Sequence, residues 1–225
     1  MAEQTGGMAA VNTNDWKSNL EELSKDFSNF YSLGYRSTRS AVDRPHAVSV
    51  SVKRKGMKVR SRKSFVEKTI ETRTAESVLA SLFYPRDENP LGISVSLGTQ
   101  KPYDDENFTI PVRISVPIGK MGLVPAGAGE RYEGTFFVYV VARDTAEKQS
   151  DLAIQRQAVS VPSKELAKAQ SRDWYYDFSI MVAPGSQRIA FAVRDLVSNQ
   201  VSYYQKNLFI TLLPKEEKKK AEEKR

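Results

Sequence analysis

The sequence predicts a mainly β protein, in which a small α/β segment precedes an antiparallel β-sandwich. From residue 91 onward, short segments rich in Val, Ile, Phe and Tyr follow one another, and Gly, Pro, Asp and Asn separate them. Several of these segments alternate apolar and polar residues, which is typical of strands with one buried face. Helical periodicity is almost confined to the region before residue 84. The chain of 225 residues, 40% of them hydrophobic, is long enough to bury a core.

The first residues predict a helix end, a short strand and a helix start. Thr5, Gly6 and Gly7 indicate that a helix stops in a turn, because glycine readily adopts the left-handed conformation that ends helices. Residues 8–11 are apolar and predict a short strand. Residues 12–15 contain Asn, Thr and Asp, the residue types that cap helix N-termini.

The helix that follows has one apolar stripe. Its members recur at the spacing of a single helix face and are Trp16, Leu20, Leu23 and Phe27. An amphipathic helix buries such a stripe against another surface, so we expect the stripe to be covered.

Three strands are expected next. Residues 30–35 predict one strand, and the alternating valines of residues 48–52 predict a second. Gly56 marks a turn, and residues 57–62 continue the period of two as a third strand. Three basic side chains then project from the same face of that strand, namely Lys58, Arg60 and Arg62.

A helix over residues 67–83 and a loop from Pro85 to Pro90 connect this region to the half that is rich in strands. Seven strands are expected there, at residues 91–98, 107–119, 132–143, 152–161, 174–183, 187–194 and 201–212. A short helix is expected at residues 163–170. The alternation in residues 112–118 and 189–193 predicts strands with one buried and one solvent-facing side.

The net charge of +7 is concentrated in the segment 53–63. This segment has seven basic residues and no acidic one: Lys53, Arg54, Lys55, Lys58, Arg60, Arg62 and Lys63. Outside it and the Lys/Glu-rich tail 214–225 the chain is close to neutral, which disfavours a dedicated nucleic-acid-binding domain. The basic hairpin is either a candidate site for a polyanion, such as a nucleic acid or an acidic polysaccharide, or an edge strand protected against aggregation. We favour the second interpretation.

Short motifs in a fixed order run through most of the chain. The first 65 residues contain TGG, FYSLGY and KVRSRKSF, and the second half contains IPVRI, a Pro-Gly turn at Pro184 and AVRD at residues 192–195. In this order they resemble the C-terminal part of von Willebrand factor type A (VWFA) related proteins of the acidobacterial kind.

The resemblance implies a division into four parts. Residues 1–64 would be the C-terminal remnant of a VWFA-like, Rossmann-like α/β domain that contains the basic hairpin. Residues 65–90 would be a connecting helix and linker, residues 91–213 an immunoglobulin-like β-sandwich and residues 214–225 a charged tail. The half of the type A domain with the metal-binding D-x-S-x-S loop would precede Met1, so no residue here is assigned as a metal ligand.

The resemblance also implies a role for the chain. It suggests a non-enzymatic structural or protein-interaction module of an exported, extracytoplasmic, adhesion-type protein. The partner would be another protein, with the missing part of the type A domain as the first candidate. Otherwise the N-terminal remnant would dock on the sandwich or mediate self-association. The chain itself shows neither a signal peptide nor the run of about 18 apolar residues that a membrane span needs.

No set of catalytic residues is evident. The chain has no cysteine, and His46 is its only histidine, which excludes zinc sites built from thiolates or from a pair of histidines. No G-x-S-x-G motif accompanies His46, so we expect it to be a surface or packing residue. We therefore expect neither an enzyme nor a cofactor, and a hydrolase with His46 as its base is the weakest alternative.

Three further features are candidates for ligand binding. The acidic residues at 87–89 and 104–107 could bind calcium, but they lack the spaced pattern of a calcium loop, and we expect solvated turns. The glycines of residues 127–134 lack the spacing and the Lys-Ser or Lys-Thr pair of a phosphate loop, so we expect a loop between strands. The aromatic residues Trp174, Tyr176 and Phe178 share one strand face, opposite Tyr175, and form either a binding platform or, as we expect, part of the core.

Overall fold

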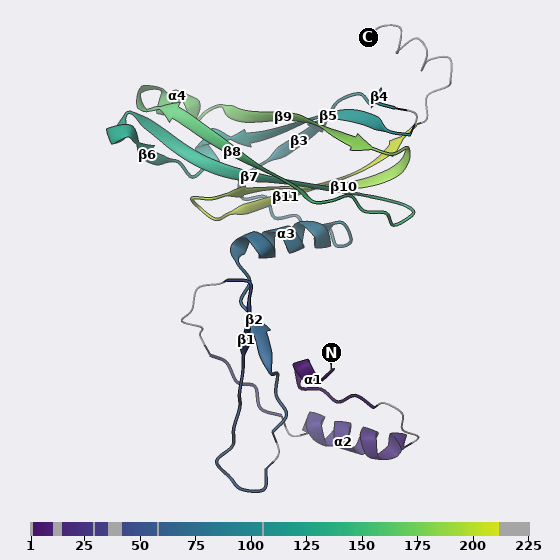
Figure 1. The fold of residues 1–225 in the computed structure, drawn as a ribbon. Helices are drawn as coiled ribbons and strands as arrows, with labels where there is room; N and C mark the ends of the chain where they lie inside the picture. Colours follow the sequence, from purple (N-terminus) through teal and green to yellow (C-terminus); the bar gives the residue numbers. More distant parts are fainter. Residues whose placement is uncertain are drawn as a thin grey trace. The chain divides into compact units, whose positions relative to one another are not determined.

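The computed structural model describes residues 2–10, 15–28, 30–35, 42–57, 59–104 and 106–211 (Figure 1). The expected features at residues 11–14, Lys58, Asp105 and the tail 214–225 lie outside the described residues. The chain divides into two compact units, Met1–Thr72 and Arg73–Arg225. The fold is mainly β, and its strands pair in antiparallel fashion, as the sequence predicts.

The first unit begins with helix α1 (Ala2–Thr5), which ends as predicted. Gly6 has a φ of +81°, and the Gly7 N–H donates to the Ala2 carbonyl at 2.9 Å. This is the hydrogen-bonding pattern of a Schellman helix end, in which a left-handed glycine reverses the chain. Residues 8–10 form no strand, in contrast to the expectation.

Helix α2 (Trp16–Ser28) confirms the predicted amphipathic helix. Its N-terminus is capped by Asp15, whose Oδ1 accepts the Ser18 N–H at 3.1 Å. The Ser18 hydroxyl donates to the other carboxylate oxygen at 2.7 Å. These hydrogen bonds lower the pKa of Asp15, the side-chain bond from Ser18 being the largest cause.

The three strands predicted after α2 are wrong in position. Residues 30–35 form no strand, and the paired strands are β1 (Pro45–Ala47) and β2 (Ser64–Val66). The Val48 N–H bonds to the Lys63 carbonyl at 2.7 Å, but the described residues between them form no further strand. A two-stranded hairpin is marginal without a sheet or helix against it. The alternating valines therefore have no buried face to define them, and Val52 is 49% exposed.

Helix α3 (Ile70–Ser81) is shorter than the predicted helix over 67–83. Thr69 caps its start, because the Thr69 Oγ1 accepts the Thr72 N–H at 3.2 Å. Asp43 in turn accepts both the N–H and the hydroxyl of Thr69 at 2.7 Å. These hydrogen bonds connect Asp43 to the residue before α3 and hold the first turn of the helix.

The second unit contains two antiparallel sheets. In the first, β5 (Phe108–Pro117) pairs with β3 (Ser94–Leu97) and β4 (Lys101–Pro102) on one side and with β9 (Asp173–Val182) on the other. In the second, the order is β11 (Val201–Ile210), β10 (Gly185–Asp195), β7 (Arg131–Asp144) and β8 (Ala153–Pro162), and the short β6 (Val124–Ala126) pairs with the start of β7.

All seven predicted strand segments are found, within a few residues of their predicted ends. The short strands β4 and β6 were not predicted. The predicted helix at 163–170 is present as η3 (Ser163–Glu165) followed by α4 (Leu166–Ala169). Two further single turns, η1 (Ile118–Lys120) and η2 (Gly127–Gly129), flank β6.

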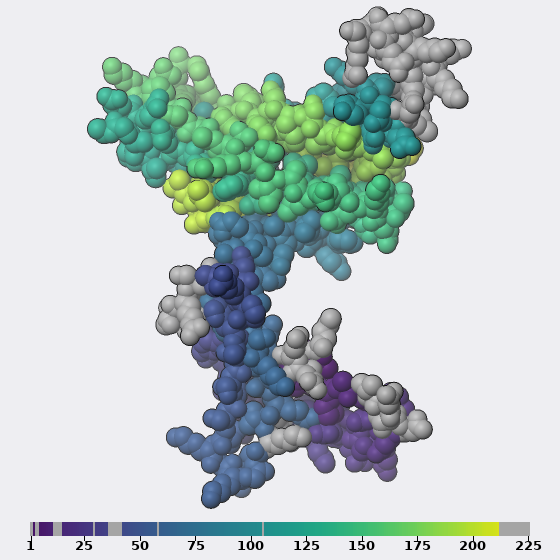
Figure 2. Space-filling view, in the orientation of Figure 1, coloured from purple at the N-terminus to yellow at the C-terminus, as the bar shows by residue number. Residues whose placement is uncertain are grey.

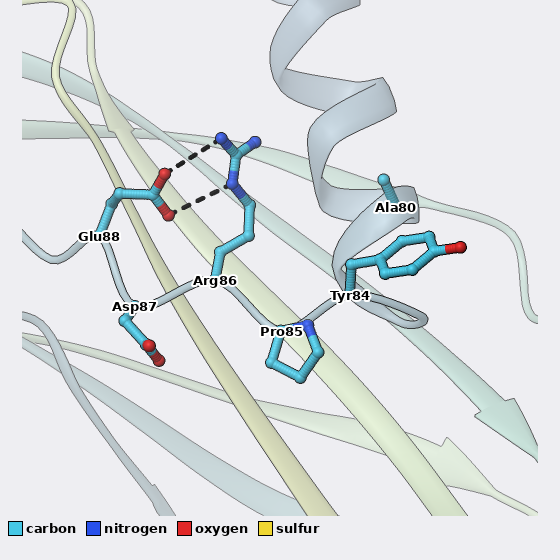
Figure 3. A pocket seen from close by; sticks show the side chains of 6 residues that line it. All are labelled: Ala80, Tyr84, Pro85, Arg86, Asp87 and Glu88. Atoms are coloured by element: carbon cyan, nitrogen blue, oxygen red, sulfur yellow. Dashed lines mark hydrogen bonds and ion pairs between the residues drawn. The ribbon is translucent and has the colours of Figure 1, made fainter.

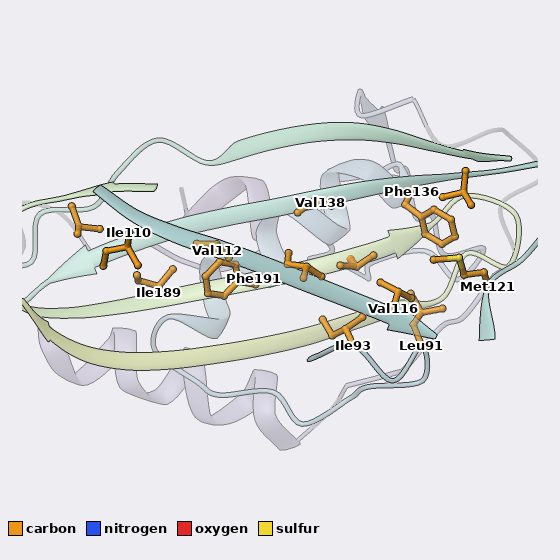
Figure 4. Packing of buried hydrophobic residues seen from close by; sticks show 14 of the residues in the cluster. Leu91, Ile93, Ile110, Val112, Val116, Met121, Phe136, Val138, Ile189 and Phe191 are labelled. Carbon is orange, nitrogen blue, oxygen red and sulfur yellow. The ribbon is translucent and has the colours of Figure 1, made fainter. Parts of the chain in front are cut away.

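One apolar core joins the two sheets. Ile110, Val112 and Val116 of β5 pack in one cluster with Phe136 of β7 and Phe191 of β10 (Figure 4). The alternate residues of β5 face outward, and Pro111 and Arg113 are exposed. For β5 the predicted division into a buried and a solvent-facing side is confirmed.

For β10 the same prediction is wrong, because both faces of this strand are buried. Ile189, Phe191 and Val193 lie in the core between the sheets, whereas Ala190 and Ala192 belong to a second cluster. That cluster also contains Val78 and Leu82 from α3 and the residue after it. Helix α3 thus covers the outer face of the second sheet, and the small alanines allow its close approach.

Candidate functional site

The apolar stripe of α2 is open to solvent. Its four side chains keep large exposed fractions: Trp16 63%, Leu20 62%, Leu23 43% and Phe27 75%. No residue of the helix is buried. The expectation that this stripe is covered is therefore wrong for the described residues. Contiguous exposed apolar surface of this kind marks interaction sites in folded proteins.

A polar face of α2 beside the apolar stripe contacts the rest of the first unit. The Arg60 guanidinium forms ion pairs with Glu22 at 3.0 Å and with Asp26 at 2.6 Å. The two acidic residues are one turn apart on a helix face that flanks the apolar stripe. These ion pairs hold the helix by its polar side and leave the apolar stripe outward.

The segment after α2 extends the exposed apolar surface. Four large side chains between residues 30 and 35 are mostly exposed, namely Phe30, Tyr31, Leu33 and Tyr35. Tyr35 also packs edge-on against Phe65, with 5.7 Å between the ring centroids. The N-terminal unit therefore has few apolar residues in a core and many at its surface.

The predicted basic ladder is not formed. Lys53, Arg54 and Lys55 are exposed in the long connection between β1 and β2, which lies at the surface (Figure 2). Arg62 and Lys63 are exposed before β2, and Lys58 lies outside the described residues. Arg60 is half-buried in its ion pairs with α2. Without a strand, the basic side chains have no regular spacing to match a phosphate repeat.

His46 lies in β1 opposite Phe65 of β2. The two rings are 5.2 Å apart between centroids, and their planes are tilted by 34°. His46 is thus one of the few residues that pack between the two strands of the hairpin. This position fits the packing role that the sequence suggests.

The second unit has two shallow hollows. One, of about 640 Å³, lies after α3, where Arg86 forms a hydrogen-bonded ion pair with Glu88 beside Tyr84 (Figure 3). The Arg86 guanidinium also lies 4.8 Å from the centre of the Tyr203 ring. Hydrogen bonding by Arg86 lowers the pKa of Glu88, and the pair is therefore ionised and neutral overall.

The other hollow, of about 600 Å³, lies on the outer face of β5 and β9. Arg113 donates two hydrogen bonds to Asp177, at 2.7 and 2.8 Å. The guanidinium lies 5.2 Å from the centre of the exposed Tyr175 ring. Hydrogen bonding by Arg113 lowers the pKa of Asp177 and raises that of Arg113. As in the first hollow, the two charges compensate each other, and here the pair joins neighbouring strands β5 and β9.

The acidic residues form turns. Asp104 Oδ1 accepts the N–H groups of Glu106 and Asn107, which closes the turn between β4 and β5. In the other acidic segment, Asn89 bonds to the N–H and carbonyl of Ile93 with its side-chain amide. Within the described ranges, no three His, Asp or Glu side chains come together as a metal site would need.

The glycine-rich loop and the aromatic group have structural positions. Gly127 and Gly129 lie in the turn between β6 and β7, and Gly134 is buried within β7. The predicted loop between strands is therefore confirmed. Trp174, Tyr176 and Phe178 pack against the common core and stack on one another, whereas Tyr175 faces outward. The prediction that these three rings lie on one face of the strand and Tyr175 on the other is confirmed.

Sequence reasoning missed a buried polar site at the end of β10. Asp195 is fully buried, and its carboxylate accepts the Gly122 N–H at 2.6 Å and the Val197 N–H at 2.8 Å. The Ser198 hydroxyl adds a further hydrogen bond at 2.9 Å. In the sequence, AVRD at residues 192–195 is only one of the motifs that carry the resemblance. Its position before a Leu-Val-Ser-Asn turn was the available signal that the Asp organises the turn.

Among the helices of the described residues, none combines the length and the apolar character that crossing a membrane would require.

Comparison with known proteins identifies no family. No protein-family model matches the chain, and no curated protein sequence matches it. A structural genomics target, SoR45, shares 9% identity with a TM-score of 0.34 over 54% of this chain and 88% of its own. A β-glucuronidase from glycoside hydrolase family 2 shares 11% sequence identity with a TM-score of 0.34. This match covers 52% of this chain and 11% of the β-glucuronidase.

A protein from Archaeoglobus fulgidus shares 11% identity with a TM-score of 0.32, over 53% of this chain and 98% of its own. The matched half of this chain covers only about a tenth of the length of the β-glucuronidase. Similarities of this size say nothing about activity.

Proposed function

We propose that this chain is a non-enzymatic protein-interaction module of an exported, extracytoplasmic, adhesion-type protein related to the VWFA proteins. The observation that carries the proposal is the exposed apolar stripe of α2. A helix that is held by its polar face and presents Trp16, Leu20, Leu23 and Phe27 outward is suited to docking against an apolar surface.

The strand order supports an immunoglobulin-like sandwich for the second unit. One sheet has the order β3, β5, β9, and the other has β8, β7, β10, β11. In chain order, these strands take the places of A, B and E in one sheet and of C′, C, F and G in the other. In this proposal the sandwich is a rigid carrier for the N-terminal unit.

The proposed partner of the N-terminal unit is the sheet of a type A domain. The last helix of an open α/β domain covers a face of its sheet, and α2 has an apolar stripe that such a face would bury. The exposed aromatic residues between 30 and 35 would then lie beside the same sheet. This role belongs to the first 72 residues and leaves the sandwich free.

The test uses Trp16 as a reporter. The chain has two tryptophans, so Trp174→Phe leaves Trp16 as the only one. On addition of a type A fragment that lacks its last helix, we expect a blue shift of Trp16 emission and binding that changes little with salt. The matched control is Leu20→Gln with Leu23→Gln, which keeps helix propensity but removes the two central side chains of the apolar stripe. Equal binding by the control variant would refute the docking role.

Polyanion binding through the basic hairpin is the second candidate. The exposed neighbours Lys53, Arg54 and Lys55 favour it, although no ladder is formed. Binding of DNA or an acidic polysaccharide through this hairpin should weaken steeply with ionic strength. It should also be lost when the exposed residues Lys53, Arg54 and Lys55 are changed to Ser. Affinity that is unchanged by salt and by these substitutions excludes this function.

A further inference from the structure

Strand β9 is an unprotected sheet edge. It pairs with β5 along its whole length, and no described strand pairs with its other side. An edge strand exposes a row of backbone donors and acceptors, and natural proteins protect such edges with Lys, Pro or breaks in the strand. The sequence of β9, DWYYDFSIMV, contains no Lys, Arg or Pro. Its Asp177 is neutralised by Arg113.

The other edges of the two sheets carry such protection. The edge opposite β9 is broken into β3 and β4, and the short β4 consists of Lys101 and Pro102. At the edges of the second sheet, β8 has Arg156 at its centre and β11 has Lys206. Among the edges of the described sheets, β9 therefore stands out as both long and unprotected.

Apolar side chains of β9 are incompletely covered on both faces. On the outer face Tyr175 is 53% and Met181 60% exposed. On the inner face Trp174, Tyr176, Phe178 and Ile180 are only partly buried. Their cross-strand neighbours on β5, such as Ile114 opposite Tyr176, are almost completely buried. A strand added beside β9 would cover the apolar side chains on its outer face and those on its inner face.

We propose that β9 pairs with β9 of a second copy of this chain, antiparallel and with Phe178 on the two-fold axis. The sheet that contains β9 in one copy then continues into the same sheet of the second copy. The interface is isologous, so each residue of the strand meets a defined counterpart in the other copy. On the outer face Tyr175 meets Met181 of the second copy, and Asp177 meets Ser179. On the inner face Tyr176 meets Ile180, and Trp174 meets Val182.

This register is selected by charge and by the extent of the strand. An axis at Asp177 would place two carboxylates directly opposite each other, which destabilises a strand pair. An axis at Ser179 would leave Tyr175 opposite Ala183, beyond the end of β9. An axis at Phe178 opposes no like charges and uses residues 174–182. The interface lies in the second unit, so the proposal goes beyond the docking role of α2 and can fail independently of it.

The first test is the oligomeric state of the full chain with charge variants at the paired outer positions, by sedimentation equilibrium. We expect the wild type to be dimeric at about 100 µM. Tyr175→Lys with Met181→Lys opposes Lys to Lys across the interface, and the dimer should be lost. Tyr175→Glu with Met181→Lys has the same number of new charges but opposes Glu to Lys, and the dimer should return. Circular dichroism establishes that each variant is folded.

The second test reads the register through disulfides, because the chain has no cysteine of its own. Opposed residues of an antiparallel pair have Cβ atoms about 5 Å apart, close enough for a disulfide after small adjustment. The double variant Tyr175→Cys with Met181→Cys should oxidise to a covalent dimer. Each single variant should not, because its two cysteines would be about 20 Å apart. A monomeric wild type, a dimeric double-Lys variant or equal cross-linking of the single variants would overturn the proposal.

Discussion

The carboxylate of Asp195 accepts the backbone N–H of Gly122 at 2.6 Å, and this bond joins the end of β10 to the segment between η1 and β6. The two residues are far apart in the sequence, and Asp195 is fully buried. A buried carboxylate is costly unless its oxygens accept hydrogen bonds, and here backbone and hydroxyl donors from Val197 and Ser198 complete the set. The site thus fixes one end of the second sheet.

Removal of the Asp195 carboxylate should destabilise the second unit strongly. Asp195→Ala leaves several partly buried N–H groups without this acceptor, and we expect a loss of about 3 kcal/mol in the free energy of unfolding. Chemical denaturation followed by far-UV circular dichroism measures this loss. The control is Ser198→Ala, which removes a single hydrogen bond and should cost about 1 kcal/mol. Equal losses in the two variants would contradict the central role of Asp195.

A side chain at position 122 should be poorly tolerated. A Cβ atom on Gly122 would lie 2.6 Å from Asp195 Oδ2 and 2.8 Å from the Val197 Cβ. Both groups are part of the same hydrogen-bonded turn, so neither can move without the loss of a bond. We expect Gly122→Ala to lower the free energy of unfolding by about 1–3 kcal/mol. Gly129→Ala is not a suitable control, because Gly129 has a φ of +88°.

Helix α3 should contribute to the stability of the second unit. Leu82 is completely buried against the outer face of the second sheet, together with Val78 and Tyr139. Leu82→Ala should therefore cost about 2–5 kcal/mol in the free energy of unfolding. The neighbouring Tyr84 is 78% exposed, and Tyr84→Ala should change the free energy by less than about 0.5 kcal/mol. If both variants unfold at the same denaturant concentration, α3 does not cover the sheet in solution.

The Arg113–Asp177 pair predicts a dependence of stability on pH. Hydrogen bonding by Arg113 lowers the pKa of Asp177 below its ordinary value of 3.8. The folded state therefore binds fewer protons than the unfolded state near this pH, and the stabilisation is present above 3.8 and lost as the pH falls through the folded-state pKa. Asp177→Asn removes this contribution. The stability difference between wild type and variant should be larger at pH 7 than at pH 2, and a difference that is independent of pH would contradict the prediction.

The strands of the second unit could be predicted from the sequence because each combines β-branched and aromatic residues with clear turn signals. The alternation in β5 also gave its buried face correctly. The same reasoning failed for β10, because Ala190 and Ala192 look solvent-tolerant in sequence but are covered by α3. Which helix covers which face is a long-range property that periodicity within one strand does not contain.

In the first unit, local patterns predicted helices better than strands. Helix α2 and the end of α1 depend on capping residues and on spacing within a few residues, such as Asp15 with Ser18. Strands require a partner, and the valines of residues 48–52 have none in the described residues. The ion pairs of Arg60 with Glu22 and Asp26 were also beyond prediction, because they join segments that are far apart in the sequence.

The central claim is that the apolar stripe of α2 is a docking surface and not part of a core. The most direct test is the free energy of unfolding of the first unit, measured by denaturant titration and followed by the helical far-UV circular dichroism signal, because the exposed Trp16 would respond little to unfolding. Leu20→Gln with Leu23→Gln keeps helix propensity and removes apolar surface. If the stripe is exposed, the double variant should unfold within about 0.5 kcal/mol of its parent. A loss of about 4 kcal/mol or more would mean that the stripe is buried within this chain, and the docking role would be wrong.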